Sequence, residues 1–247
     1  MYRFLFFLLF APLASAQTLR LAAAADLQPV LPPILAQFEA KNHIHVDASY
    51  QSSGTLTTQI QNGAPFALFM AADLSFPQRV IASGLADSAQ PVAYARGTLV
   101  LWTRNDSPFP QLSVNTLRDP ALKTVAIANA EHAPYGRAAE ASLKGLGIYD
   151  QVKPKLVVAE NIAQTAQYAD SGNAQVGLIS LTSALTDRLR TSGHYFVMPR
   201  DSYPPILQGA VVLKNSPDKA AAHQLLDFLL SPAVQKELSA RGLEPAH

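Results

Sequence analysis

The chain of 247 residues contains no cysteine. Disulfide frameworks and thiolate metal sites are therefore excluded. Charge is also scarce, because charged residues make up 15% of the chain and 19 basic side chains nearly balance 18 acidic ones. Such a chain lacks the basic surface that drives binding to nucleic acids or membrane surfaces. We expect no nucleic-acid partner, and a fold that depends on burial of its apolar core.

Long apolar runs are confined to the N-terminus. Residues 1–16 combine a single charge at Arg3, an apolar stretch and the small residues Ala14-Ser15-Ala16, which is the pattern of a cleavable secretory signal peptide. No later stretch approaches the roughly 18 consecutive apolar residues that a membrane-spanning helix needs. We therefore expect an exported protein that acts in the periplasm, and its mature chain is formally neutral once Arg3 is removed.

The sequence does contain a regular alternation of short apolar runs with stretches of helical periodicity. The predicted strands are 19–24, 44–46, 67–70, 97–102, 124–128, 156–159 and 176–179, and the predicted helices are 27–40, 55–61, 75–83, 136–146, 162–170 and 182–191. Near the end of the chain, Ser216-Pro217 and Ser231-Pro232 predict two capped helix starts. Strands that alternate with helices indicate an α/β fold whose sheets are covered on both faces.

Two segments look like passages between separate lobes. Residues 91–97 and 198–205 both carry proline or glycine between periodic stretches. If the chain leaves a first lobe at one and returns at the other, the first lobe comprises 17–93 and 203–247, and the second comprises 94–202.

Six short segments carry a resemblance to a known family. They are 21–27 (LAAAADL), 52–56 (SSGTL), 62–65 (NGAP), 71–73 (AAD), 131–136 (EHAPYG) and 228–232 (FLLSP). Taken in order, they resemble the molybdate-binding periplasmic proteins of ABC transporters. The resemblance implies a type II periplasmic-binding-protein fold, with two α/β lobes joined by two crossing segments around a ligand cleft. It also implies a monomeric solute-binding protein, not an enzyme, that needs no cofactor and delivers molybdate, or tungstate, to a membrane permease.

The physical basis of such a site is visible in the sequence. A helix that follows a strand presents unpaired N–H groups and the positive end of its dipole, so it can bind an anion without a charged side chain. Four predicted helices begin in this way: one directly after the alanines that end the first strand, and three near Ser53, Tyr135 and Ile162. The resemblance implies ligand contacts at the positions of Asp26, Ser53, Tyr135, Ile162 and Ser180.

Two of these positions depart from the family pattern, because Asp26 replaces a serine and Ser180 replaces a tyrosine. Two unit charges about 4 Å apart repel by roughly 4 kcal/mol at an effective dielectric near 20, and a dianion raises this further. Asp26 either caps its own helix and faces away, or lies in the pocket beside a compensating cation, or meets a ligand that carries a hydrogen or positive charge, such as a protonated oxyanion or a metal ion. We favour an oxyanion bound with the help of Arg137 and Ser53.

Other functions find weaker support. His43, His45 and Asp47 predict either a small metal site or the solvated face of a strand, and Glu131-His132 predicts either an acid–base pair or a loop. The nucleophile elbow, the His-Glu-x-x-His pair and the glycine-rich phosphate loop are all missing from the sequence. A secreted hydrolase and a ligand-sensing domain are therefore disfavoured alternatives.

Overall fold

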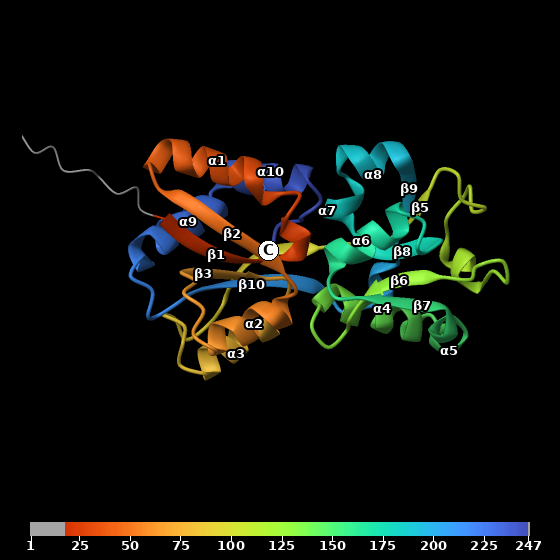
Figure 1. Cartoon of the computed structure of the whole chain (residues 1–247), viewed down its shortest axis with the longest axis horizontal. Helices are drawn as coiled ribbons and strands as arrows, with labels where there is room; N and C mark the ends of the chain where they lie inside the picture. The colour runs from red at the N-terminus through yellow and green to blue at the C-terminus, as the bar shows by residue number, and fades with distance from the viewer. Residues whose placement is uncertain (1–17, 247) are drawn as a thin grey trace, which may run out of the picture.

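The computed structural model describes residues 18–246, so the expected signal peptide at 1–16 lies outside the described residues. Within that range, no helix combines the length and apolar character needed to cross a bilayer. Figure 1 shows two groups of strands and helices side by side along the long axis.

The elements alternate along the chain. The strands are β1 Thr18–Ala24, β2 His45–Gln51, β3 Leu68–Ala71, β4 Val92–Gly97, β5 Leu99–Arg104, β6 Val125–Ala128, β7 Leu156–Ala159, β8 Val176–Ser180, β9 Gly193–Val197 and β10 Ile206–Val212. The α-helices are α1 Leu31–Asn42, α2 Ser53–Gln61, α3 Ser75–Ala82, α4 Pro134–Gly145, α5 Tyr149–Val152, α6 Ile162–Asp170, α7 Leu181–Ala184, α8 Asp187–Ser192, α9 Lys219–Leu230 and α10 Pro232–Ala240. Short 3₁₀ helices are η1 Ala25–Leu27, η2 Val114–Arg118, η3 Lys153–Lys155 and η4 Arg200–Ser202.

The first lobe is built on a sheet of order β2-β1-β3-β10-β4. Strands β1, β2 and β3 are parallel, and β10 is antiparallel to both of its neighbours. Successive side chains of β1 face opposite sides, so Leu21 packs with α1, α9 and α10, whereas Ala22 packs with α2 and α3. The sheet is therefore buried on both faces, as the apolar runs of its strands predict.

The second lobe repeats this plan on a sheet of order β7-β6-β8-β5-β9. Strand β6 is parallel to β7 and β8, and β5 is antiparallel to β8 and β9. One face packs against α4 and α5, and the other places Trp102 against α6 and α8. In both lobes the parallel strands end on the side that faces the other lobe, the usual ligand position in open α/β sheets.

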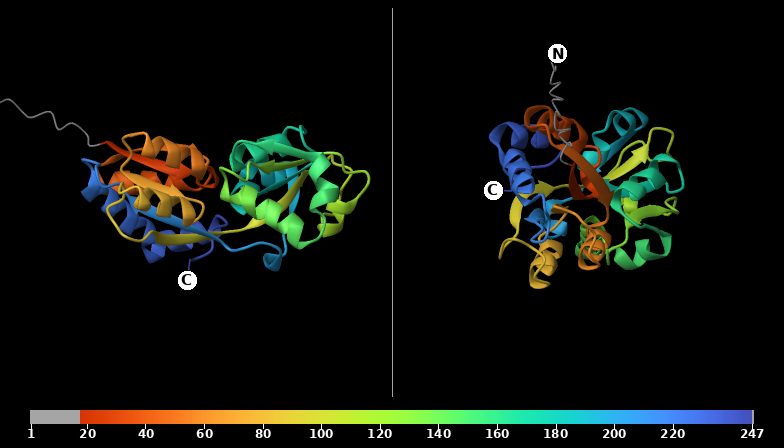
Figure 2. Two further views of the ribbon diagram at one scale, coloured as in Figure 1. Left: turned by 90° about the horizontal axis from the view of Figure 1, so that it is seen from below. Right: turned by 60° about the vertical axis from the view of Figure 1, so that its left-hand side comes forward.

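Two segments cross between the lobes, and Figure 2 shows them as yellow and blue strands below the gap. In the first, β4 ends at Gly97 and β5 begins at Leu99, so a single residue, Thr98, separates the two sheets. The boundary expected at 93/94 falls inside β4. In the second, the chain passes from β9 through η4 into β10.

Several local predictions are wrong at the ends of helices. The helix expected from residue 27 begins at Leu31, because Pro32 and Pro33 favour the first helical turn. The helix expected at 182–191 is divided at Thr186, whose hydroxyl accepts the amide hydrogen of Leu189 and starts α8.

The two serine–proline starts also differ from expectation. Helix α9 begins at Lys219 with Asp218 as its N-cap, so Ser216-Pro217 lies before the helix. Helix α10 does begin at Pro232, but the Ser231 hydroxyl donates to the carbonyl of Phe228 (2.6 Å) and caps nothing. Strands β4, β9 and β10 were not predicted, since proline or glycine at their ends resembled loop punctuation.

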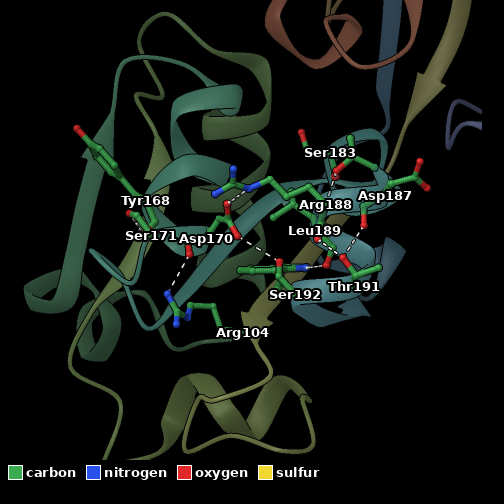
Figure 3. A network of polar contacts seen from close by, with 12 residues as sticks. Arg104, Tyr168, Asp170, Ser171, Ser183, Asp187, Arg188, Leu189, Thr191 and Ser192 are labelled. Carbon is green, nitrogen blue, oxygen red and sulfur yellow. Dashed lines mark hydrogen bonds and ion pairs between the residues drawn. The ribbon is translucent and has the colours of Figure 1, made fainter.

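Helix α6 is held in place by a polar network at its C-terminal end (Figure 3). The Asp170 carboxylate accepts from Arg188 Nε (2.5 Å) and Ser192 Oγ (3.2 Å), and its carbonyl accepts from Arg104 (3.2 Å). The Asp170 side chain is only 11% exposed. The network ties α6 to α8 and β5, and so fixes the direction in which the α6 N-terminus points.

Asp170→Ala should therefore lower the free energy of unfolding by about 1–2 kcal/mol, because two side-chain hydrogen bonds to a nearly buried carboxylate are lost. Urea denaturation measures this. Asp187→Ala is the matched control, since the Asp187 side chain is 96% exposed in its pair with Arg190, and it should change stability by only a few tenths of a kcal/mol. Equal losses in the two variants would contradict a role for the Asp170 network.

Candidate functional site

The candidate site lies where the ends of first-lobe strands meet the starts of second-lobe helices. Ala24 is the last residue of β1, Ala25 follows it, and Ala72 follows β3; all three pack in one buried cluster with second-lobe residues. The second-lobe partners include Ala133 and Tyr135 at the start of α4 and Ile162 at the start of α6. The small alanines let the two lobes approach each other at this point.

Three helices direct their N-termini toward this region. Ser52 caps α2 by accepting from Thr55 N, and Asn161 caps α6 by accepting from Gln164 N, whereas α4 has no side-chain cap. Helical hydrogen bonding leaves the first-turn amides of Ser53, Tyr135 and Ile162 without intrahelical partners. These amides, with the helix dipoles behind them, form a site suited to an anion.

The side chain of Ser53 adds a hydroxyl donor. It is buried, and its oxygen accepts the amide hydrogen of Ala72 at 3.0 Å. Because that bond uses an oxygen lone pair, the hydroxyl hydrogen remains available for a ligand oxygen.

Asp26 lies at the base of the site and is fully buried. Its Oδ2 accepts from Gln208 Nε2 at 2.5 Å, whereas its Oδ1 has no hydrogen-bond partner. Neither η1, with Ala24 as its N-cap, nor α1, with Val30, has a side-chain cap, so Asp26 does not cap the helix that follows it as one hypothesis expected. Burial raises the pKa of Asp26 to about 6, and the hydrogen bond from Gln208 offsets part of the rise.

Arg137 does not neutralise Asp26. Its guanidinium forms an ion pair with Asp73 of the first lobe, approaches Ser75 Oγ (3.5 Å) and stacks over the Phe76 ring. It lines a cavity of about 260 Å³ at the rim of the interface between the lobes. The proposed role of Arg137 as the cation beside Asp26 is therefore not what the geometry supports.

Ser180 lies behind the site. Its hydroxyl caps α7 by accepting from Ser183 N (3.3 Å), and it also contacts Ser183 Oγ (2.9 Å). The neighbouring Thr182 hydroxyl donates to the carbonyl of Asp26 at 2.8 Å. Ser180 thus positions the segment that touches the Asp26 backbone, and its hydroxyl is occupied within the second lobe.

The two lobes are in direct contact across the site. Gly54 N, in the first turn of α2, donates to the carbonyl of His132 (2.8 Å), and the Thr55 hydroxyl donates to Glu160 (3.1 Å). A side-chain carbon at Gly54 would lie 2.9 Å from the Cα of His132, so only glycine permits this approach. The structure is therefore a closed form.

The other candidate sites are not assembled. His43 ends α1 in the left-handed region (φ 56°) and does not share a strand face with His45, which bonds to Glu39 at 3.0 Å. Within residues 18–246, no group of three metal-ligating side chains comes together. Glu131 and His132 lie 4.0 Å apart at the surface, and it is the His132 carbonyl that contacts the first lobe.

Sequence reasoning missed Gln208 and Gly54. Gln208 is a polar residue within the otherwise apolar strand 206–212, and this break in the pattern could have marked it as the partner of a buried polar group. Gly54 lies in a segment that matches the family. The reason it must be glycine is the close approach of His132 from the other lobe, and that contact cannot be read from the sequence.

Comparisons with known proteins agree with this geometry. Residues 19–244 match the model of a family described as bacterial extracellular solute-binding proteins. The molybdate-binding protein ModA of Azotobacter vinelandii is 36% identical over 95% of this chain and 92% of its own, and that of Rhodobacter capsulatus is 36% identical over 90% and 85%. The solved periplasmic molybdate-binding protein of A. vinelandii superimposes with a TM-score of 0.85 at 29% identity, covering 91% of this chain and 98% of that one. The sulfate-binding protein SubI of Mycobacterium tuberculosis shares the fold, with a TM-score of 0.76 at 17% identity over 93% and 87%.

The raised pKa of Asp26 predicts a pH-dependent stability. The native protein holds this proton more tightly than the unfolded chain, so Asp26 destabilises the fold increasingly as pH rises from the ordinary carboxyl range, near 3.8, through about 6. Above that range, Asp26→Asn should be more stable than wild type by roughly 2–3 kcal/mol, relative to their difference at about pH 4. Urea denaturation of the closed, anion-bound proteins at several pH values measures the gap, with Asp187→Asn as the exposed control. A gap that does not change with pH would contradict the burial of an ionisable Asp26.

Proposed function

The chain belongs to the bacterial extracellular solute-binding proteins, and from that premise we propose that it captures molybdate and delivers it to the membrane permease of an ABC transporter. The relatives that support this are molybdate-binding proteins that match nearly the whole chain. We place the protein in the periplasm as a monomer that catalyses no reaction. The signal-like segment at residues 1–16 and the periplasmic relative support that location.

The observation that carries the proposal is the convergence of three helix N-termini from both lobes on one buried point. The first-turn amides of Ser53, Tyr135 and Ile162 and the hydroxyl of Ser53 supply donors, and Arg137, on the same helix as Tyr135, is engaged by Asp73. Donors on fixed backbone suit a small anion that is dehydrated on binding and accepts hydrogen bonds on all sides. Tungstate has the same charge and shape as molybdate and should compete for the site.

Binding is proposed to proceed by closure of the lobes. Each lobe supplies some of the hydrogen-bond donors, so an anion held by one lobe favours the closed form, in which the donors of the other lobe also reach it. The segments around Thr98 and 198–205 absorb the change in backbone dihedral angles. The closed surface, with Gly54 against His132, is what the permease would recognise.

A protonated oxyanion is the second candidate ligand. The observation that favours it is the unpartnered Oδ1 of Asp26, which as a carboxylate accepts a hydrogen bond from a ligand hydroxyl. Such a ligand has a hydroxyl hydrogen to donate to Asp26 Oδ1, whereas the molybdate dianion has none.

The test is titration calorimetry with molybdate, tungstate, sulfate and phosphate. We expect one molybdate per chain, with tungstate similar and the other two much weaker. Ser53→Ala should weaken molybdate binding roughly 5- to 30-fold, the equivalent of one hydrogen bond to a charged group. Ser180→Ala is the control and should leave affinity within about threefold, because its hydroxyl is used inside the second lobe. Absence of molybdate binding, or phosphate bound in preference, would overturn the proposal.

Gly54→Ala separates closure from folding. Alanine within a helix is favoured over glycine by up to about 1 kcal/mol, so the ligand-free protein should be as stable as wild type or more so. Its added carbon collides with the His132 backbone, so molybdate affinity should fall at least about tenfold. Thermal unfolding and calorimetry give the two values. Thr55→Ala, which removes the exposed bond to Glu160 and the contact with the Ser52 hydroxyl (2.6 Å) but leaves the backbone of α2 unchanged, should change affinity little. Unaltered affinity in Gly54→Ala would contradict the closed geometry.

A further inference from the structure

Asp26 sits in a buried polar cluster that spans the hinge. The cluster comprises Asp26 of η1, Gln208 of β10 and Tyr135 of α4, hence one residue of the first lobe, one of a crossing strand and one of the second lobe. The other crossing strand closes around it, because a side-chain carbon at Gly97 would lie 2.2 Å from the Tyr135 hydroxyl oxygen and 3.3 Å from Gln208 Nε2. Any movement of the lobes therefore changes the surroundings of this carboxyl group.

If Asp26 is ionised, the cluster has fewer hydrogen-bond donors than acceptors. Gln208 Nε2 donates to Oδ2, and three buried atoms remain without partners: Asp26 Oδ1, Gln208 Oε1 and the Tyr135 hydroxyl. With a carboxylate, two of these atoms can only accept and one hydroxyl hydrogen serves them both. A proton on Oδ1 adds a second donor, so the numbers of donors and acceptors match.

The charges around the cluster do not favour a carboxylate. Tyr135 of α4 and Tyr94 of β4 face it, and burial raises the pKa of both, so they stay neutral. Helix α7 carries no ionisable side chain, and on α6 the one carboxylate, Asp170, is engaged by Arg188 at the far end of the helix. The end of β2 beside η1 holds Gln51 and Tyr50. Burial raises the pKa of Tyr50 to about 12, so this side chain is also neutral.

We propose that Asp26 is a specificity-determining residue that carries a proton when the lobes close on molybdate, so that the protein binds the dianion together with one proton. The inference rests on the proposed function and adds a proton to its ligand. An ionised Asp26 repels a dianion at close range. A neutral Asp26 removes that repulsion, and its added hydrogen completes the cluster with Gln208 and Tyr135.

The proposal has a definite pH dependence. In an open form, Tyr135 and Thr182 withdraw from Asp26, water reaches the carboxyl group, and its pKa is close to the ordinary value. In the closed form, burial raises the pKa to about 6 even though the hydrogen bond from Gln208 offsets part of the rise, and a dianion raises it further. Molybdate affinity should therefore fall by up to about tenfold per pH unit from the ordinary carboxyl range to the pKa of the bound form, and level off above it.

The experiment counts protons directly. Calorimetric titration of the full mature chain with molybdate, at about pH 6 to 8 in buffers of different ionisation enthalpy, gives the number of protons taken up per molybdate. Wild type should take up close to one proton at the acidic end of this range. Asp26→Asn, which has the shape and hydrogen-bonding pattern of the neutral acid, should bind molybdate with almost no uptake and a nearly flat pH profile. Asp73→Asn, which alters the carboxylate that pairs with Arg137 across the lobes, should keep the wild-type proton count.

Each other outcome is decisive. Molybdate binding by wild type without proton uptake overturns the inference and leaves the proposed function intact. Uptake that persists in Asp26→Asn places the proton elsewhere and also overturns it. If neither protein binds molybdate, it is the proposed function that fails. Because the wild-type count alone decides the first outcome, the test stands even if Asp26→Asn folds poorly.

Discussion

The proposed capture of an anion imposes one electrostatic constraint on the structure: an anion taken out of water between the lobes has to be met by backbone dipoles instead of a basic side chain. Fixed N–H groups serve this purpose only if the helices that carry them are rigid and their first turns are unobstructed. The doubly covered sheets of both lobes provide that rigidity, and the network at Asp170 anchors α6 from behind. The alanines at the end of β1 and Gly54 leave room for the opposing backbone.

The same constraint explains why the charge at Asp26 matters more than the net charge of the chain. Dipoles fixed by the fold cannot be rearranged to offset a carboxylate, and the arginine beside the cleft is already paired with Asp73. The carboxyl group lies in the hinge between Gln208 and Tyr135, and its burial there raises its pKa to about 6, which favours the neutral form. The protonation state of Asp26 is thus linked both to the charge of the ligand and to the closure of the lobes.

The α/β architecture and the positions of the three helix starts follow from sequence, because strand and helix periods are local properties and the residues near Ser53, Tyr135 and Ile162 match a known pattern. The partners of Asp26 and Arg137 could not be derived in this way. Gln208 lies 182 positions from Asp26 along the chain, and Asp73 lies 64 positions from Arg137, so these contacts depend on how the lobes pack. Serine–proline pairs were also insufficient to locate the starts of the last two helices, since Asp218 rather than Ser216 precedes α9.

We infer that the lobes close around the anion and form the contact between Gly54 and His132 only then. Small-angle X-ray scattering of the mature chain, with and without saturating molybdate, measures this closure. We expect a smaller radius of gyration and a smaller maximum dimension in the presence of molybdate. A radius of gyration that stays the same while calorimetry shows the site to be filled would contradict it.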